Sequence, residues 1–158
     1  MVQGAVMFGW KPKFVKSRKS KRTYGTSFVS RFRQNVDPER LMFYGDDNVK
    51  WCSRRFAKLV SVNQEIEIDH TVKSSYTPSY HNILEMAINV YESEKNDVTY
   101  CDEPGVRLLG TISVPMTNTT GDMNREVRVT VCFGRTEIIV SGKDLTSGAN
   151  VQAAFDFL

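Results

Sequence analysis

The chain has 158 residues, which suits a single domain of ordinary size, and 41% of them are apolar, which is enough for a hydrophobic core. No apolar run approaches the roughly twenty residues of a membrane helix, and the apolar N-terminus precedes its positive charges, whereas a secretory signal has the charges first. The net charge of +3 is unevenly spread, since nine of the 21 basic residues and no acidic residue precede Asp37. The sequence therefore predicts a basic arm joined to a mildly acidic body.

The N-terminal part divides into an apolar segment and a basic one. Residues 1–10 (MVQGAVMFGW) are interpreted as the end of a helix or a short buried segment. Residues 11–23 (KPKFVKSRKSKRT) combine Pro12 with seven positive charges, which favours a solvated linker. The same charges leave a second interpretation open, binding to nucleic acid or to an anionic membrane surface, which would be strongly salt-dependent.

Short extended segments follow in the middle of the chain. We expect an extended segment over 24–32, a polar and irregular connection over 33–55, and a short apolar strand over 56–60. Ile66 and Ile68 alternate with acidic residues, which is typical of a strand with one buried face. These patterns indicate strands joined by turns.

The second half of the chain continues this pattern. Alternation over 84–90 predicts a strand, but residues 83–91 also satisfy a helical period, so the pattern alone leaves both open. Further strand-like runs, separated by turns that contain glycine, occupy 109–114, 127–133, 138–140 and 151–157. Several short strands with turns at about ten-residue spacing predict an all-β fold, an antiparallel β-sandwich.

The sequence contains no recognisable catalytic or metal-binding motif. His70 and His81 lack a metal-ligand spacing, and the three cysteines form no CxxC pair. Three thiols without a disulfide framework favour a cytoplasmic protein. The segment Gly4–Gly9 has two glycines at phosphate-loop spacing but lacks the Lys-Ser/Thr that would reach a phosphate. We therefore expect no enzymatic activity, no metal and no cofactor in this chain.

A series of short motifs follows the order and spacing of one known family. In chain order they are MVQGAVMFG, Tyr24-Gly25, Phe56–Val60, Tyr76-Thr77, Ile88–Glu94, Leu109-Gly110, Val127–Val131 and Val140–Gly148. Together they span nearly the whole chain, which resembles the C-terminal part of the seventy-kilodalton heat-shock (DnaK-type) chaperone family. The segment between Phe32 and Phe56 and the ending Phe155–Leu158 are similar to the divergent twelve-type branch of that family.

The resemblance implies a domain division and a function. Residues 1–10 would be the end of an ATPase domain, residues 11–23 a basic linker, and residues 24–158 a β-sandwich, which favours a strand over 84–90. Intact relatives bind ATP, and the ATPase domain, a partner of the sandwich in those relatives, is otherwise missing here. The implied function is non-catalytic, chaperone-like binding of unfolded or extended apolar peptides. A truncated product without a role of its own is the remaining alternative.

The resemblance also implies which residues form the peptide site. Carried over by position, they are a channel-facing residue, two arch residues, a pocket aromatic, the pocket centre and its neighbour: Thr26, Val29 and Ser79, Tyr76, Met86, and Ile88. From their alternation, Met86 and Ile88 also fit a hydrophobic core, and Tyr76 also fits the edge of the sandwich. Because the family places a smaller residue at the pocket centre, the flexible Met86 implies a shallower pocket.

Overall fold

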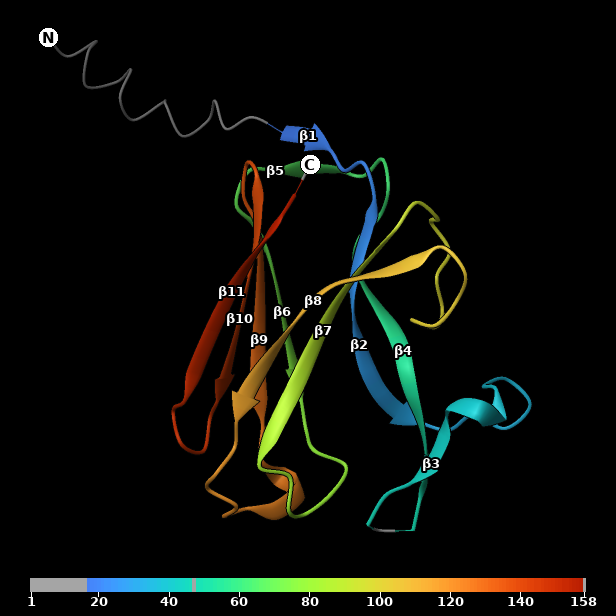
Figure 1. Ribbon diagram of the computed structural model, residues 1–158, viewed down its shortest axis with the longest axis vertical. Helices are drawn as coiled ribbons and strands as arrows, with labels where there is room; N and C mark the ends of the chain where they lie inside the picture. Colours follow the sequence, from blue (N-terminus) through green and yellow to red (C-terminus); the bar gives the residue numbers. More distant parts are fainter. Residues whose placement is uncertain (1–16, 47, 158) are drawn as a thin grey trace, which may run out of the picture.

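The computed structural model describes residues 17–46 and 48–157, which form mainly β-strands (Figure 1). The helix or buried segment predicted for residues 1–10 lies outside the described residues. The strands are β1 (Ser17–Lys19), β2 (Thr23–Arg31), β3 (Met42–Tyr44), β4 (Lys50–Val60), β5 (Glu65–Glu67), β6 (His70–Tyr76), β7 (Glu85–Ser93), β8 (Val106–Pro115), β9 (Val127–Phe133), β10 (Glu137–Asp144) and β11 (Asn150–Asp156). Two short 3-10 helices, η2 (Glu39–Leu41) and η3 (Asp122–Asn124), lie between strands. The all-β prediction is confirmed.

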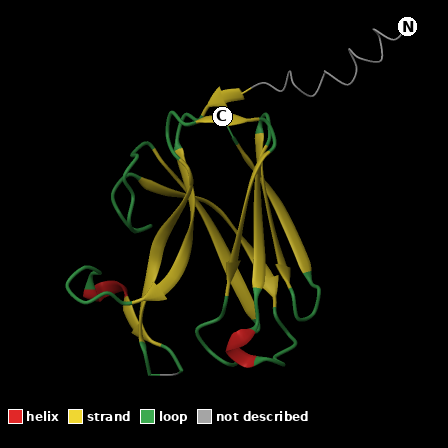
Figure 2. Ribbon diagram, turned by 180° about the vertical axis from the view of Figure 1, so that it is seen from behind, coloured by secondary structure: helices red, strands yellow, loops and turns green. Residues whose placement is uncertain are grey.

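The strands form two antiparallel sheets that face each other (Figures 1 and 2). One sheet has the strand order β3-β4-β2-β7-β8, and the other has the order β11-β10-β9-β6. A separate pair, β1 with β5, crosses one end of the sandwich (Figure 1). The sandwich predicted from the alternating pattern is therefore present.

Alternate residues of the strands meet in a core between the two sheets. In β9 every second residue from Val127 to Phe133 is buried, as expected for a strand with one covered face. Across the core, β8 packs on β10 and β11. Gly110 of β8 allows this approach, because a Cβ atom there would collide with the ring of Phe155 in β11. The Leu109-Gly110 motif thus marks a close contact between the sheets.

Several strands differ from what the pattern alone indicated. Residues 83–91, open between helix and strand, contribute most of β7, as the resemblance implied. β3 and the start of β4, at Lys50, both lie inside the connection expected to be irregular, where the pattern showed no alternation. β6 was not predicted, because Val72 and Tyr76 are its apolar residues and neither is fully buried. The start of β4 and the whole of β6 were missed because few of their residues are apolar.

The described part of the predicted linker, from residue 17 onward, begins with a strand attached to the sandwich. The basic β1 pairs with the acidic β5, which favours the pairing electrostatically. The Arg18 guanidinium lies 4.2 Å from the ring centroid of Phe157 and donates to the carbonyls of Gly134 and Arg135. A solvated linker was expected here, but residues 17–19 are attached to the sandwich by these contacts.

Candidate peptide-binding groove

The five-stranded sheet opens at one end, between β2 and β7. β2 pairs with β7 only over Thr23–Thr26, opposite Val90–Ser93. Beyond that point β2 stays with β4, while β7 stays with β8, and the two pairs of strands diverge (Figure 1). Within the described part of the chain, the edge of β7 that faces away from β8 therefore has no strand beside it from Glu85 to Asn89.

A β-bulge in β4 accompanies this divergence. From Phe28 to Ser30, β2 advances by two residues while the paired β4 advances by three. The bulge contains Arg54, whose φ of 56° lies in the left-handed region. A bulge bends its strand and increases the local twist. It therefore gives a physical reason for β2 and β4 to turn away from β7.

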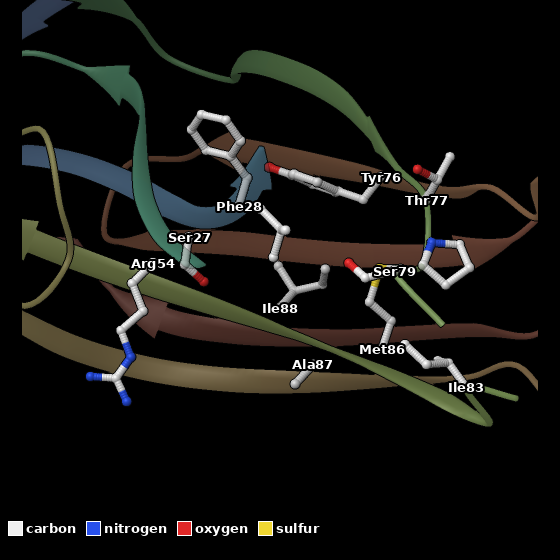
Figure 3. Close-up of a pocket in the computed structure, with 12 residues that line it drawn as sticks. Ser27, Phe28, Arg54, Tyr76, Thr77, Ser79, Ile83, Met86, Ala87 and Ile88 are labelled. Atoms are coloured by element: carbon white, nitrogen blue, oxygen red, sulfur yellow. The ribbon is translucent and has the colours of Figure 1, made fainter. Parts of the chain in front are cut away.

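A cavity of about 160 Å³ lies where the strands separate (Figure 3). Its lining includes residues 27–29 of β2, Arg54 of β4, Tyr76 at the end of β6, residues 77–79 and Ile83 of the β6–β7 connection, and residues 86–88 of β7. A second cavity of about 170 Å³ shares residues 28–29 and 76–79 with the first and adds Ser75 and Trp51. The two cavities are therefore neighbours, separated by the residues that they share. We call the two cavities together the groove.

Five of the six residues carried over from the family line the first cavity. They are Val29, Tyr76, Ser79, Met86 and Ile88. Thr26 does not line it, because its side chain is buried and its hydroxyl is hydrogen-bonded to the Tyr76 hydroxyl at 2.8 Å. The fold thus brings together side chains from three separate segments of the sequence.

For Ile88, Met86 and Tyr76 the sequence left open whether they line the site or serve the fold, and in the structure each does both. Ile88 is 2% exposed and belongs to the hydrophobic core, so it forms the floor of the cavity. Met86 is half-buried and packs against that core while it faces the cavity. Tyr76 lines the cavity and also links β6 of one sheet to β2 of the other through Thr26. Figure 3 shows the rings of Phe28 and Tyr76 beside each other near Ile88.

A buried arginine holds the β6–β7 connection in place. Arg125 is 1% exposed, and its guanidinium donates to the carbonyls of Ile83 and Met116 at 2.8 and 2.9 Å and to that of His81 at 3.0 Å. Its Nε donates to the carbonyl of Asp122 at 2.8 Å. Arg125 therefore ties one wall of the groove to the β8–β9 connection.

The segment around β3 supports the same wall from the other side. The Asp46 carboxylate accepts a hydrogen bond of 2.6 Å from the main-chain N–H of His81. The Tyr80 hydroxyl donates to the carbonyl of Tyr44 at 3.3 Å, and its ring centroid lies 6.1 Å from that of Phe43. Part of the connection expected to be irregular thus positions the residues that follow Ser79.

The sequence did not indicate several groove residues, among them Phe28, Arg54 and Ile83. Phe28 lies in a segment predicted only as extended, and nothing in the local sequence marks Arg54 as a bulge residue. The signal available for Ile83 was its place in an apolar run whose secondary structure was open. Their place in the groove depends on how β2, β4 and β7 diverge.

Two of the three cysteines lie buried in the structure. Burial raises the pKa of the Cys101 thiol to about 12 and also raises the pKa of the Cys52 thiol, so neither is an activated nucleophile. Over residues 17–46 and 48–157, no three His, Cys, Asp or Glu side chains gather as metal ligands would. The same residues include no helix of the length and hydropathy that a membrane span requires.

Comparison with known proteins identifies relatives over the whole chain. No protein-family model matches it. The human and mouse heat shock 70 kDa protein 12A are each 35% identical over 162 residues, and the human heat shock 70 kDa protein 12B is 31% identical over 166 residues. Each match covers 100% of this chain but 24% of the relative, so the chain spans about a quarter of the length of these proteins. The resemblance stated from the sequence is confirmed: over its whole length the chain is homologous to heat shock 70 kDa proteins 12A and 12B, matching the C-terminal part of this heat-shock-70-like branch.

Proposed function

We propose that this chain binds extended apolar peptide segments in the groove between β2 and β7, without catalysis. The observation that carries the proposal is the open edge of β7 beside a cavity with an apolar lining. Along Glu85–Asn89, alternate residues turn their N–H and C=O groups toward the side that β2 has left. A peptide in extended conformation satisfies such groups by adding a strand.

The cavity supplies the second element of recognition, a place for one apolar side chain. Phe28, Tyr76, Ile83, Met86 and Ile88 provide its apolar surface. A volume of about 160 Å³ compares with the ~150 Å³ apolar cavity that accepts a benzene molecule. Burial of a leucine side chain contributes roughly 1.5–3 kcal/mol. We therefore expect a leucine-centred heptapeptide to bind about ten- to a hundredfold more tightly than its glycine-centred counterpart.

Exposed apolar side chains around the groove support the same proposal. Val29, Leu84 and Tyr44 are large apolar residues that remain well exposed. Val29 lines both cavities, Leu84 follows the lining residue Ile83, and Tyr44 accepts the hydrogen bond from Tyr80. Apolar surface gathered beside a groove is typical of a binding site.

The test is fluorescence anisotropy of a labelled leucine-centred heptapeptide with matched variants. Val29 is 42% exposed and Leu145, in the β10–β11 turn, is 40% exposed, so the two sites differ in position rather than in exposure. Val29→Asp should abolish binding, whereas Leu145→Asp should leave it unchanged. Equal effects of the two substitutions, or no binding by the unmodified chain, would refute peptide binding at the groove.

Met86 offers a finer test of the pocket. Its flexible side chain occupies part of the space that a peptide leucine would fill. Met86→Val should therefore tighten binding of the leucine-centred peptide, by up to about tenfold, at a stability cost below about 2 kcal/mol. Unchanged affinity in the folded variant would assign Met86 to the core instead.

Binding of anionic surfaces by the basic arm is the competing function. In the described part of the arm, Arg18 contacts Phe157 and Arg22 forms an ion pair of 2.7 Å with Glu92, so these two charges already serve the fold. Peptide binding through an apolar pocket should depend weakly on salt, whereas binding through the arm should weaken steeply with salt. A salt titration of each interaction separates the two functions.

A further inference from the structure

We propose that the groove selects peptides in which an acidic residue flanks the apolar anchor, and that Arg54 reads this acidic residue. The inference rests on the proposed peptide binding and adds a charge preference to it. Its basis is the charge of the groove: Arg54 is the charged side chain among the described residues that line the two cavities. The other lining residues are apolar or carry hydroxyl groups.

The position of Arg54 suits this role. It is the left-handed bulge residue of β4, where the strands separate, and its side chain is exposed. In Figure 3 it extends beyond Ser27, at the end of the cavity away from Ile83. A ligand anchored in the cavity would therefore place a neighbouring residue, not the anchor itself, beside this guanidinium.

Arg54 is also free to accept a ligand carboxylate. Within the described residues its guanidinium has no carboxylate within salt-bridge distance, whereas Arg22, Arg33 and Arg40 are each paired with an acidic side chain. A guanidinium presents a planar set of donors that matches a carboxylate in bidentate geometry. The fold thus leaves this cation unpaired at the mouth of an apolar cavity.

Two further arginines give the groove the same sign of charge. Arg55 lies 5.2 Å from the ring centroid of Phe28, and its buried Nε has no hydrogen-bond partner within the described residues. Arg31 lies 5.5 Å from the ring of Trp51, which lines the second cavity. Positive charge therefore accompanies both cavities along the side formed by β2 and β4.

Two acidic side chains beside the lining residues are already engaged in other hydrogen bonds. Asp46 accepts from the main-chain N–H of His81, and Glu85 accepts from the Ser113 hydroxyl of β8 at 2.9 Å. Neither lines a cavity. A basic residue beside the peptide anchor would meet Arg54 and be repelled, whereas an acidic one would be attracted.

The expected preference is modest because Arg54 is exposed to solvent. An exposed ion pair strengthens binding by about two- to fivefold, and added salt weakens it further. Three heptapeptides with the same central leucine and with Asp, Asn or Lys beside it should therefore bind in that order at low salt. The difference between the Asp and Lys peptides should shrink at high salt, while binding of the Asn peptide stays nearly constant.

The decisive measurement compares these peptides on the unmodified chain and on Arg54→Asn by fluorescence anisotropy. Asn suits the left-handed backbone of the bulge, so this substitution removes the charge with little strain. The matched control is Arg135→Asn, an exposed arginine in the β9–β10 turn at the end of the sandwich that carries β1. Arg54→Asn should abolish the order of the three peptides, and Arg135→Asn should preserve it.

Other outcomes distinguish this inference from the proposed function. Equal binding of all three peptides to the unmodified chain would overturn the charge preference and leave peptide binding intact. Persistence of the preference in Arg54→Asn would show that Arg54 does not read the acidic residue. Failure of every leucine-centred peptide to bind would overturn the proposed function and the inference with it.

Discussion

The two sheets of the sandwich differ in how completely their inner strands are paired. In the four-stranded sheet, β9 is paired with β10 and β6 along its full length, Val127–Phe133. In the five-stranded sheet, β7 is paired with β8 throughout but with β2 only over Val90–Ser93. One sheet is therefore a closed structural layer, whereas the other leaves backbone groups and a cavity exposed at one end. The comparison sets a fully paired sheet against one whose strand β7 keeps an open edge, and this open edge is where we propose that a peptide binds.

The largest effect is expected from Arg125, which holds the β6–β7 connection beside the open edge of β7. Arg125→Ala removes four hydrogen bonds to main-chain carbonyls, of which the bond to the Met116 carbonyl is fully buried. We expect it to lower the free energy of unfolding by about 3–5 kcal/mol, because a hydrogen bond from a charged group contributes about 1.5–3 kcal/mol and several such bonds are lost together. Urea denaturation measures the change.

Arg128→Ala is the matched control for that substitution. Arg128 lies three residues further along, its side chain is 54% exposed, and its ion pair with Glu126 is at the surface. We expect a change below about 0.5 kcal/mol. If both substitutions had the same small effect, Arg125 would not be the residue that secures the groove wall.

A second prediction concerns the link between the sheets at the point where β2 leaves β7. The hydroxyls of Thr26 and Tyr76 are hydrogen-bonded at 2.8 Å across the two sheets. Thr26→Val and Tyr76→Phe should each lower stability by about 0.5–1.5 kcal/mol. Because both remove the same bond, the double variant should lose less than the sum of the single losses. Strictly additive losses in a double-mutant cycle would contradict a direct link.

A third, smaller effect is predicted for the acid stability of the segment before β3. The Arg33 guanidinium, with help from the Tyr100 hydroxyl, holds the pKa of the Asp37 carboxyl well below its usual range. A carboxyl with a depressed folded-state pKa contributes stability that is present above its unfolded pKa of about 3.9 and is lost as the pH falls further. Asp37→Asn should therefore lower stability by about 1 kcal/mol at pH 7 and by progressively less below pH ~4.

The measurement for Asp37 is the urea midpoint of both proteins between pH 7 and pH 2. The curves should approach each other toward the acid end, because the carboxyl of the unfolded chain becomes protonated below its pKa of about 3.9, which favours unfolding of the unmodified protein. Curves that stay parallel over this range would contradict the predicted role of the charge.

The difference between the sheets also explains which parts could be predicted from sequence. β9 alternates strictly because one face is covered along its length, so its pattern was readable. β7 was ambiguous by pattern and was assigned through the family motif Ile88–Glu94. β6 carries few apolar residues at the edge of its sheet and gave no signal.

The candidate site shows the same limit. Val29, Tyr76 and Met86 were named from the family resemblance, and in the structure all three line one cavity. The bulge at Arg54 could not be predicted, because a left-handed residue other than glycine leaves little trace in the sequence. Nor could the role of Arg125, since its partners are main-chain carbonyls, which every residue carries. Features that depend on backbone geometry therefore required the structure.

The central claim, that the open edge of β7 receives an extended peptide, is tested most directly by amide hydrogen exchange. The rates are measured with and without a saturating leucine-centred heptapeptide. In the free protein, amides on the open side of Glu85–Asn89 should exchange faster than those of Val127–Phe133, which are paired on both sides. The peptide should slow exchange within Glu85–Asn89 and leave β9 unchanged. Bound peptide without added protection along Glu85–Asn89 would contradict the claim.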